Sequence, residues 1–304
     1  MRILVTGAGG FIGRSVVRKA RKRGWEVTGV ARRPCAEAGR IADLRQPIEG
    51  WPAPDAVIHL AGAFAGCGYR ELAESDLKMA ANLLDWGRRQ GVRRWVFASA
   101  AEVYGDIAGV ADESWPCRPV IPYGKAKLEI ERMFQAAGLP ELTICRLGEV
   151  YGPHSRILSE LGGRLRRGFC PWPGDGNVKI SFVHVEDAAE ALLLAAERRA
   201  QEPRVYNVGD GEPATWRQFM DLLAEMLHAR RAIYLPLPVA RCYAACASLV
   251  DGNITPHVLR LMITPKVLSS ERARAELRFV PRYDSIHEGL KAALSDPEAL
   301  SDPL

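Results

Sequence analysis

A tyrosine and a lysine four positions apart, Tyr123 and Lys127, open a predicted helix in the sequence Tyr123-Gly-Lys-Ala-Lys127. Helical residues at this spacing lie on one face, so the two side chains can act together. A tyrosine with a pKa of about 10 is a poor acid/base group near neutral pH, and a nearby ammonium group is expected to lower that pKa by about 1 to 3 units. The pair is therefore a candidate for proton transfer, although the same spacing is common on helices without chemistry.

A glycine-rich turn near the start of the chain could hold the phosphates of a nucleotide. The apolar segment Arg2–Thr6 predicts a strand that runs into Gly7-Ala-Gly-Gly-Phe-Ile-Gly13, in which Gly7, Gly10 and Gly13 recur at every third position. Glycines let the main chain turn tightly and bring backbone N–H groups and a helix N-terminus close to a phosphate. The spacing is a variant of the dinucleotide fingerprint with a first turn that is one residue longer.

The elements around this turn form the unit that a dinucleotide fingerprint requires. Apolar residues at helical spacing predict a helix with one apolar face, which Gly24 ends, and a second strand is predicted at Glu26–Ala31. Strand, loop, helix and strand thus follow one another within about thirty residues. The alternative is a glycine-rich turn in an unrelated α/β protein.

The residues after the second predicted strand indicate which dinucleotide is bound. Folds that bind NAD usually place an Asp or Glu about twenty residues beyond the glycines, where it holds the ribose hydroxyls. This chain has Arg32 and Arg33 there. Two guanidinium groups could bind the 2′-phosphate of NADP. NADP is therefore the predicted cofactor, with NAD as the alternative, unless both arginines are merely solvated loop charges.

Strands and helices alternate along the first half of the chain. The apolar segments 55–60 and 94–99 predict strands, with a long amphipathic helix at 71–90 between them, and the helix that Tyr123 opens is predicted to continue to about residue 137. This alternation predicts an α/β fold with a Rossmann-type, doubly wound parallel sheet and right-handed crossovers. Ala61 and Gly62 follow a strand and would lie at the edge where such sheets bind ligands.

Several motifs occur together in one order. They are the glycines after the first strand, His59-Leu-Ala-Gly62, Glu102-Val-Tyr-Gly105, Tyr123-Gly-Lys-Ala-Lys127 and Arg146-Leu-Gly-Glu-Val-Tyr-Gly-Pro153, followed by segments 174–187, 206–211 and 269–279. In these motifs the chain resembles the extended short-chain dehydrogenase/reductases, the NAD(P)-dependent epimerase/dehydratase family. The resemblance extends over essentially the whole chain.

The resemblance implies hydride transfer between a nicotinamide and a carbon that bears oxygen. In that reaction Tyr123 would give or take the proton of the oxygen, and Lys127 would be its electrostatic partner and would orient the ribose. It also implies a cofactor-binding set composed of Gly7, Gly10, Phe11, Ile12, Gly13, Arg32, Arg33, Asp43, Leu44, Leu60, Ala61, Gly62, Ser99, Tyr123 and Lys127.

Two further catalytic candidates lie near the end of the strand at 94–99. Relatives usually carry a serine or threonine where this chain has Ala100. Ser99 is one position earlier, although adjacent strand residues face opposite ways. Glu102 matches the acid/base glutamate of dehydratases and nucleotide-sugar decarboxylases of the family. The alternative for Glu102 is a solvated loop acid or the partner of a nearby arginine.

The chain is expected to divide into two interleaved regions. Residues 1–152 are predicted to form the dinucleotide-binding Rossmann domain, to which residues 181–212 return through a strand near 204–208. Residues 153–180 and 213–304 are expected to form a smaller substrate-binding lobe, because prolines punctuate short elements from Pro171 onward.

The predicted function is that of an NAD(P)-dependent oxidoreductase or epimerase, with a nucleotide-linked sugar as the default substrate by analogy, since the fold does not fix the substrate. The first alternative is an NADPH-dependent reductase of a non-sugar hydrophobic carbonyl, resembling the hydroxysteroid or dihydroflavonol branches. Ile180-Ser-Phe, where many sugar enzymes carry Arg-Asp-Phe, and the apolar region 235–261 favour it. The second alternative is a catalytically weakened NADP-binding regulatory protein, which Ala100 suggests.

Composition restricts partners and location. The net charge is +5, and the basic face of the first helix is expected to be solvated, so nucleic acid is not an expected partner. Seven scattered cysteines fit neither a disulfide framework nor a metal site and suit a reducing cytoplasm. An N-terminal strand leaves no room for a signal peptide, and no apolar run is long enough to span a membrane. We therefore expect a soluble cytoplasmic enzyme with a small-molecule substrate.

We also expect a homodimer through the helices at 71–90 and 123–137, which carry more apolar residues than one buried face needs.

Overall fold

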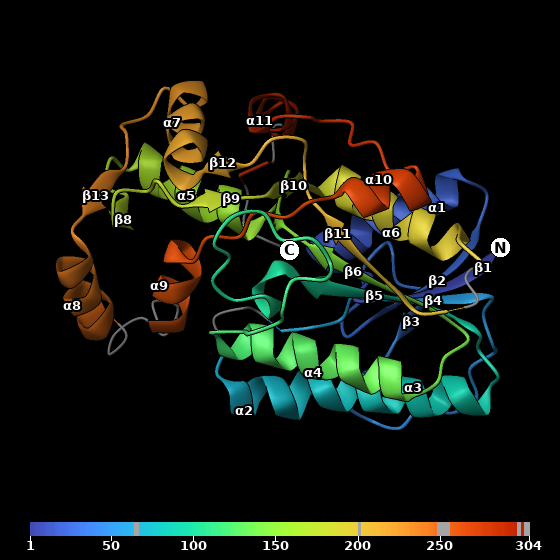
Figure 1. Ribbon diagram of the computed structural model, residues 1–304. Coiled ribbons are helices and arrows are strands. Elements are labelled where there is room, and N and C mark those ends of the chain that lie inside the picture. Colours follow the sequence, from blue (N-terminus) through green and yellow to red (C-terminus); the bar gives the residue numbers. More distant parts are fainter. Residues whose placement is uncertain (64–66, 200–201, 248–255, 297–298, 301–304) are drawn as a thin grey trace.

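A seven-stranded parallel sheet organises the chain (Figure 1). The computed structural model describes residues 1–63, 67–199, 202–247, 256–296 and 299–300. The strands follow the order β11-β6-β5-β4-β1-β2-β3. They are β1 (Arg2–Thr6), β2 (Glu26–Ala31), β3 (Arg40–Ile41), β4 (Ala56–His59), β5 (Arg94–Ala100), β6 (Glu141–Leu147) and β11 (Arg204–Val208). The strand order reverses between β1 and β4, where doubly wound folds bind dinucleotides. The predicted Rossmann-type fold is confirmed.

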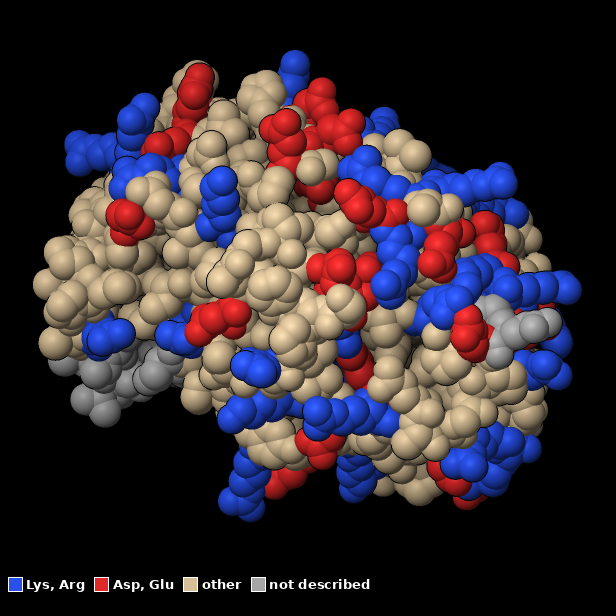
Figure 2. All heavy atoms as spheres, viewed as in Figure 1, with Lys and Arg blue, Asp and Glu red and all other residues tan. Residues whose placement is uncertain are grey.

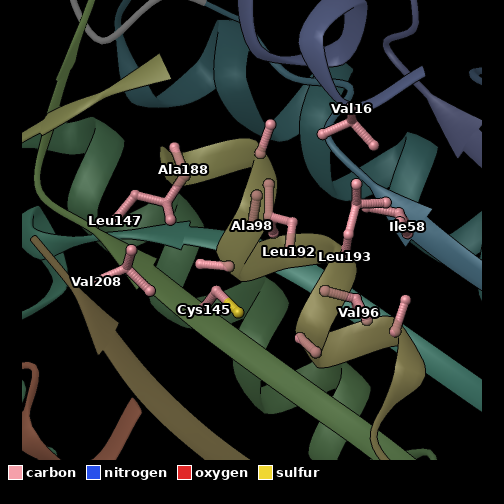
Figure 3. Close-up of a cluster of buried hydrophobic side chains, with 14 of the residues drawn as sticks. Val16, Ile58, Val96, Ala98, Cys145, Leu147, Ala188, Leu192, Leu193 and Val208 are labelled. Carbon is pink, nitrogen blue, oxygen red and sulfur yellow. The ribbon is translucent and has the colours of Figure 1, made fainter. Parts of the chain in front are cut away.

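Helices cover both faces of the sheet. On one face lie α1 (Phe11–Lys22), α6 (Val185–Glu197) and α10 (Glu271–Leu277). Figure 3 shows how short apolar side chains of α1 and α6 pack onto the strands, among them Val16, Ala188, Leu192 and Leu193 against Ile58, Val96, Ala98 and Cys145. Alanine-rich α6 can approach the sheet closely because its buried side chains are small.

The other face is covered by α3 (Lys78–Arg89) and α4 (Pro122–Ala136), which lie side by side below the sheet in Figure 1. The helix predicted at 71–90 is present, but α2 (Tyr69–Leu72) is joined to α3 by a π-helical turn, η1 (Ala73–Leu77). The large apolar residues of α3 and α4 are buried in the core, and their exposed positions include Lys78, Asp85, Lys125 and Arg132. The expected surplus of apolar residues on these helices is therefore wrong.

The sequence prediction also differs from the structure in two smaller respects. Strand β3 was not predicted, because it has only two residues and no periodicity. The basic face of α1 is not simply solvated, because Lys19 lies 3.4 Å from Glu186 and 3.5 Å from Glu190 of α6, and Arg23 pairs with Glu190 and Glu197. Figure 2 shows basic and acidic residues interleaved over much of the visible face.

The remaining elements pack over the C-terminal edge of the sheet, and we call them the capping region. It contains α5 (Arg156–Arg166), α7 (Trp216–Met226), α8 (Leu237–Ala247), α9 (Pro256–Ile263) and α11 (Ile286–Leu294), with the strand pairs β8 (Pro171–Pro173)/β13 (Ile233–Leu235) and β9 (Lys179–Ile180)/β12 (Ala214–Thr215). A cluster of aromatic rings, including Trp172, Phe182, Trp216 and Phe219, holds the region together. The pair β7 (Glu149–Tyr151)/β10 (Phe182–His184) connects it to the sheet.

Two features are absent from the described residues. No helix in the described part of the chain is long and apolar enough to cross a membrane. Within the same ranges, no cluster of His, Cys, Asp and Glu could hold a metal ion.

Candidate active site

A cavity of about 650 Å³ lies between the C-terminal edge of the sheet and the capping region. The sheet side contributes Phe11 and Ile12 of α1, Leu60 after β4, Ser99, Ala100 and Glu102 at the end of β5, and Tyr123 and Lys127 of α4. The structure thus brings together residues of several motifs that are more than a hundred positions apart.

The glycine turn after β1 has the geometry that a bound pyrophosphate requires. Gly7 has a φ of +70°, a conformation that side chains disfavour. A Cβ on Gly13 would lie 2.0 Å from the Gly7 carbonyl oxygen, so only glycine lets α1 begin this close to the turn. A Cβ on Gly7 would lie 2.9 Å from the Ala61 nitrogen, which places the turn against the loop after β4. This cradle fits a nicotinamide dinucleotide.

A hydrogen-bonded pair fixes the loop after β4. The Thr6 hydroxyl lies 2.7 Å from His59 Nδ1 and accepts the backbone N–H groups of Leu60 and Ala61, each at 3.1 Å. Complete burial, with the charge of Lys127, lowers the pKa of His59 to about 3 and keeps its ring neutral. His59 therefore acts as an anchor below the cavity floor.

Asp76 holds the same loop from the other side. Its carboxylate accepts the Ala63 N–H at 2.9 and 3.1 Å and is 1% exposed. Asp76 lies in the π-helical turn η1, and such turns recur at functional sites because they redirect one side chain.

Tyr123 and Lys127 face the cavity from the first two turns of α4. Pro122 suits the first position of a helix, where no backbone N–H is needed. The Lys127 Nζ donates to the Ala98 carbonyl at 3.3 Å and lies 5.5 Å from the centre of the Tyr123 ring. Burial lowers the pKa of Lys127, and the carboxylates of Asp76, Glu102 and Glu131 oppose this effect.

The protonation of Tyr123 differs from the sequence prediction. We expected Lys127 to lower its pKa, but desolvation, followed by the negative charges of Glu102, Asp76 and Glu149, raises it well above the ordinary value. The sequence shows the lysine four positions away, whereas only the fold brings the three carboxylates close. Tyr123 therefore carries its proton at neutral pH.

Ser99 borders the cavity, yet its hydroxyl is already used. It donates to Glu131 Oε1 of α4, and the same carboxylate binds Arg146 of β6 at 3.0 and 2.6 Å. Ser99, Glu131 and Arg146 are 3%, 1% and 5% exposed. The strand alternation that separates Ser99 from Ala100 thus turns the serine toward this buried ion pair.

Glu102 is a partner in another ion pair. Its Oε1 accepts from Lys266 Nζ at 2.6 Å, and Lys266 also donates to Glu149 Oε2 at 2.9 Å. Both glutamates line the cavity with Tyr123. Ala100 also faces the cavity, so the structure offers a methyl group where relatives have a hydroxyl.

The other predicted cofactor residues lie near the ends of β2 and β3 and do not line this cavity. Arg32 and Arg33 are exposed after β2. The Arg45 side chain and backbone bind Asp43 and lower the pKa of that carboxyl to about 2. The Leu44 side chain is buried in the core, so only its backbone can reach a ligand.

Sequence reasoning missed most of the cavity wall that the capping region supplies. This wall contains Ile157, Leu161, Trp172, Trp216, Leu235, Leu259, Leu261 and Met262. The apolar character of residues 235–261 was the one signal that could indicate part of it. Lys266 and Glu131 carried no signal, because nothing local distinguishes a buried charge from an exposed one. Arg146 belongs to one of the family motifs, but its ion pair with Glu131 could not be predicted from the sequence.

The parallel sheet, the glycine cradle and the Tyr123–Lys127 pair define a nicotinamide-dependent enzyme. The model of the NAD dependent epimerase/dehydratase family matches residues 3–209. The chain belongs to this family, whose members of the extended short-chain dehydrogenase/reductase type act by hydride transfer. The predicted family and the predicted enzyme class are confirmed.

Individual relatives differ in their reactions. The chain is 28% identical to a 2-alkyl-3-oxoalkanoate reductase of Stenotrophomonas maltophilia, over 96% of this chain and 98% of the relative. It is 26% identical to a UDP-glucose 4-epimerase of Corynebacterium glutamicum, over 99% and 97% of the two chains. The structure of MoeE5 in complex with UDP-glucose and NAD is similar with a TM-score of 0.81 and 28% identity, covering 97% of this chain and 98% of that one.

Proposed function

We propose that the protein is an NADP(H)-dependent reductase of a hydrophobic, non-sugar ketone. The apolar wall that the capping region gives the cavity carries this proposal. A ligand that packs against such a wall is recognised mainly through its apolar surface, and a few polar groups orient it. Ile180 and Ser181, which favoured a reductase in the sequence, are buried and do not line the cavity, so they add no support to this proposal. The S. maltophilia relative is named as the reductase of an alkyl-substituted keto acid, which is a non-sugar ketone that also carries a carboxylate.

The environment of Tyr123 favours the direction of reduction. When bound, the nicotinamide cofactor supplies the hydride. Tyr123 would donate the proton that the carbonyl oxygen needs, and its surroundings keep that proton on the phenol. An epimerase begins instead by oxidising an alcohol, which requires the phenolate. Lys127 would orient the ribose, and Ser99 would support α4 through Glu131.

A substrate panel tests this function. Purified protein is mixed with NADPH and either an alkyl-substituted cyclic ketone, an aryl ketone or UDP-glucose, and loss of the reduced nicotinamide is followed by absorbance. We expect oxidation of one NADPH for each alcohol formed from a hydrophobic ketone, and none with UDP-glucose. Cofactor binding without turnover of any substrate would favour the regulatory alternative.

A nucleotide-linked sugar is the second candidate substrate. Arg156 and Arg164 line the cavity and could approach a diphosphate, although Arg156 also pairs with Glu160. The similar structure of MoeE5 contains UDP-glucose and NAD. Interconversion of UDP-glucose and its 4-epimer without net use of cofactor would replace the reductase proposal by this one.

Replacement of Arg32 and Arg33 by Ala together is expected to weaken NADP binding about ten- to a hundredfold, since each charge-assisted hydrogen bond to a phosphate contributes about 1.5 to 3 kcal/mol. NAD binding should change little. Calorimetric titration of both cofactors measures the difference. The control is Glu37→Gln, which removes a charge near the glycine turn and leaves Arg32 and Arg33 in place. Glu37 is a buried carboxylate that lies 4.0 Å from Arg14. Equal losses for NAD and NADP in the double variant would contradict NADP preference.

Assembly, location and domain division stay predictions. We propose a dinucleotide-binding domain of residues 1–152 with 181–212, a substrate-binding lobe of residues 153–180 and 213–304, and a cytoplasmic location. The parallel pairing of β11 with β6 supports the return of 181–212 to the sheet. A homodimer through α3 and α4 now rests on the family resemblance alone. A monomer in sedimentation at micromolar concentration would refute it.

A further inference from the structure

A buried lysine joins the two glutamates of the cavity wall. Lys266 lies between α9 and α10, is 1% exposed and donates to both Glu102 and Glu149. Glu102 belongs to the short turn after β5, and Glu149 begins β7, so three separate segments meet at one ammonium group. Lys266 does not line the cavity itself.

The backbone holds Lys266 in this place. Its N–H donates to the Lys179 carbonyl at 3.1 Å, and its carbonyl accepts the Ser181 N–H at 2.8 Å. Lys179 is the first residue of β9, and Ser181 lies between β9 and β10. These bonds fix the backbone at Lys266, and its buried side chain contacts both carboxylates, so this is a built ion cluster rather than a loose surface pair.

The charges around the cluster make the lysine necessary. Tyr123 and Lys127 face it from α4, and Asp76 adds a third carboxylate from η1. Neighbouring carboxylates oppose each other's ionisation, and an opposite charge between them offsets this effect. Lys266 supplies that opposite charge to both Glu102 and Glu149.

We propose that Lys266 is a positioning residue of the active site, which fixes the ionised carboxylates of Glu102 and Glu149 beside Tyr123. It couples the segment after α9, where the capping region meets the sheet, to the proton donor. This inference rests on the proposed function in that Tyr123 is taken as the acid of a ketone reduction. Lys266 acts only through the two glutamates, because it does not reach the cavity.

Lys266→Met is the first test. We expect kcat to fall about ten- to a hundredfold, because the two carboxylates lose their fixed place beside Tyr123, and the KM for NADPH to stay within about twofold. The acid limb of the kcat profile should move to higher pH by about one unit or more, because a carboxyl without its cation holds its proton longer. Lys266→Arg keeps the charge and should keep the position of the limb. A fall in kcat with an unmoved acid limb would show a merely structural role.

A second readout needs no substrate. Carboxyl ¹³C NMR of protein labelled at the glutamate side-chain carboxyl reports each titration, with Glu102→Gln and Glu149→Gln to assign the two resonances. In Lys266→Met, one of these should titrate at higher pH than in the unaltered protein. An unchanged titration of both would overturn the proposal, whereas failure of the ketone panel alone would overturn the proposed function.

A double variant covers the case in which Lys266→Met does not fold. Lys266→Met/Glu149→Gln removes one positive and one negative charge and leaves Glu102 as the one glutamate of the cluster. We expect the Glu102 resonance to titrate at higher pH in this variant than in Glu149→Gln alone. Identical titrations in the two variants would show that Lys266 does not control Glu102.

Discussion

Tyr123→Phe is expected to lower kcat for ketone reduction by about 10² to 10⁴, the contribution of a positioned acid. Among the predicted catalytic residues, only Tyr123 and Ser99 carry a hydroxyl group. The Ser99 hydroxyl donates to Glu131 of a buried ion pair, which leaves Tyr123 as the proton donor. Stopped-flow measurement of hydride transfer from NADPH gives the rate of the chemical step. Cofactor affinity should change little, because the ring and its packing on α4 are kept.

The pH dependence of this reaction has a defined sign. Desolvation and the nearby carboxylates raise the pKa of Tyr123, so the proton-donating form persists through neutral and mildly alkaline pH. We expect the rate of reduction to be level there and, on the alkaline side, to fall only where the phenol ionises. Tyr69→Phe is the matched control, because Tyr69 is exposed on α2 and does not line the cavity. If Tyr123→Phe keeps full activity on the true substrate, the assignment of the acid is wrong.

Arg146→Met is expected to lower the free energy of unfolding by about 3–5 kcal/mol, because it leaves the Glu131 carboxylate buried without its cation. Glu131 is 1% exposed. Of the three residues Ser99, Glu131 and Arg146, only the neutral hydroxyl of Ser99 would then remain in contact with its carboxylate. Urea unfolding followed by circular dichroism measures the change.

Two comparisons separate this effect from simple loss of a charged residue. Arg146→Met/Glu131→Leu removes both charges and should recover much of the stability, since apolar replacements of a buried pair are often tolerated. Arg89→Ala breaks the exposed Arg89–Asp85 pair of α3 and should change stability by less than about 1 kcal/mol. A loss for Arg146→Met as small as that for Arg89→Ala would show that the ion pair contributes little.

The active-site residues were predictable to different degrees. Tyr123 and Lys127 face one cavity because a spacing of four on a helix sets their common direction. The identity of Ala100 was visible, but the direction of the Ser99 hydroxyl depended on Glu131, which is 32 positions away. The sign of the pKa shift of Tyr123 was not predictable, because Glu102, Asp76 and Glu149 come from three other elements.

The sequence by itself determined the β1–turn–α1–β2 unit and the parallel sheet, since glycine positions and hydrophobic periodicity act over a few residues and require no knowledge of distant contacts. Only the tertiary structure decided that Lys266 meets Glu102 across 164 positions. It alone also decided that scattered apolar residues of α5, α7 and α9 form one wall of the cavity. The physical reason is that burial and electrostatic fields depend on the distance between groups in space, and separation along the chain does not fix that distance.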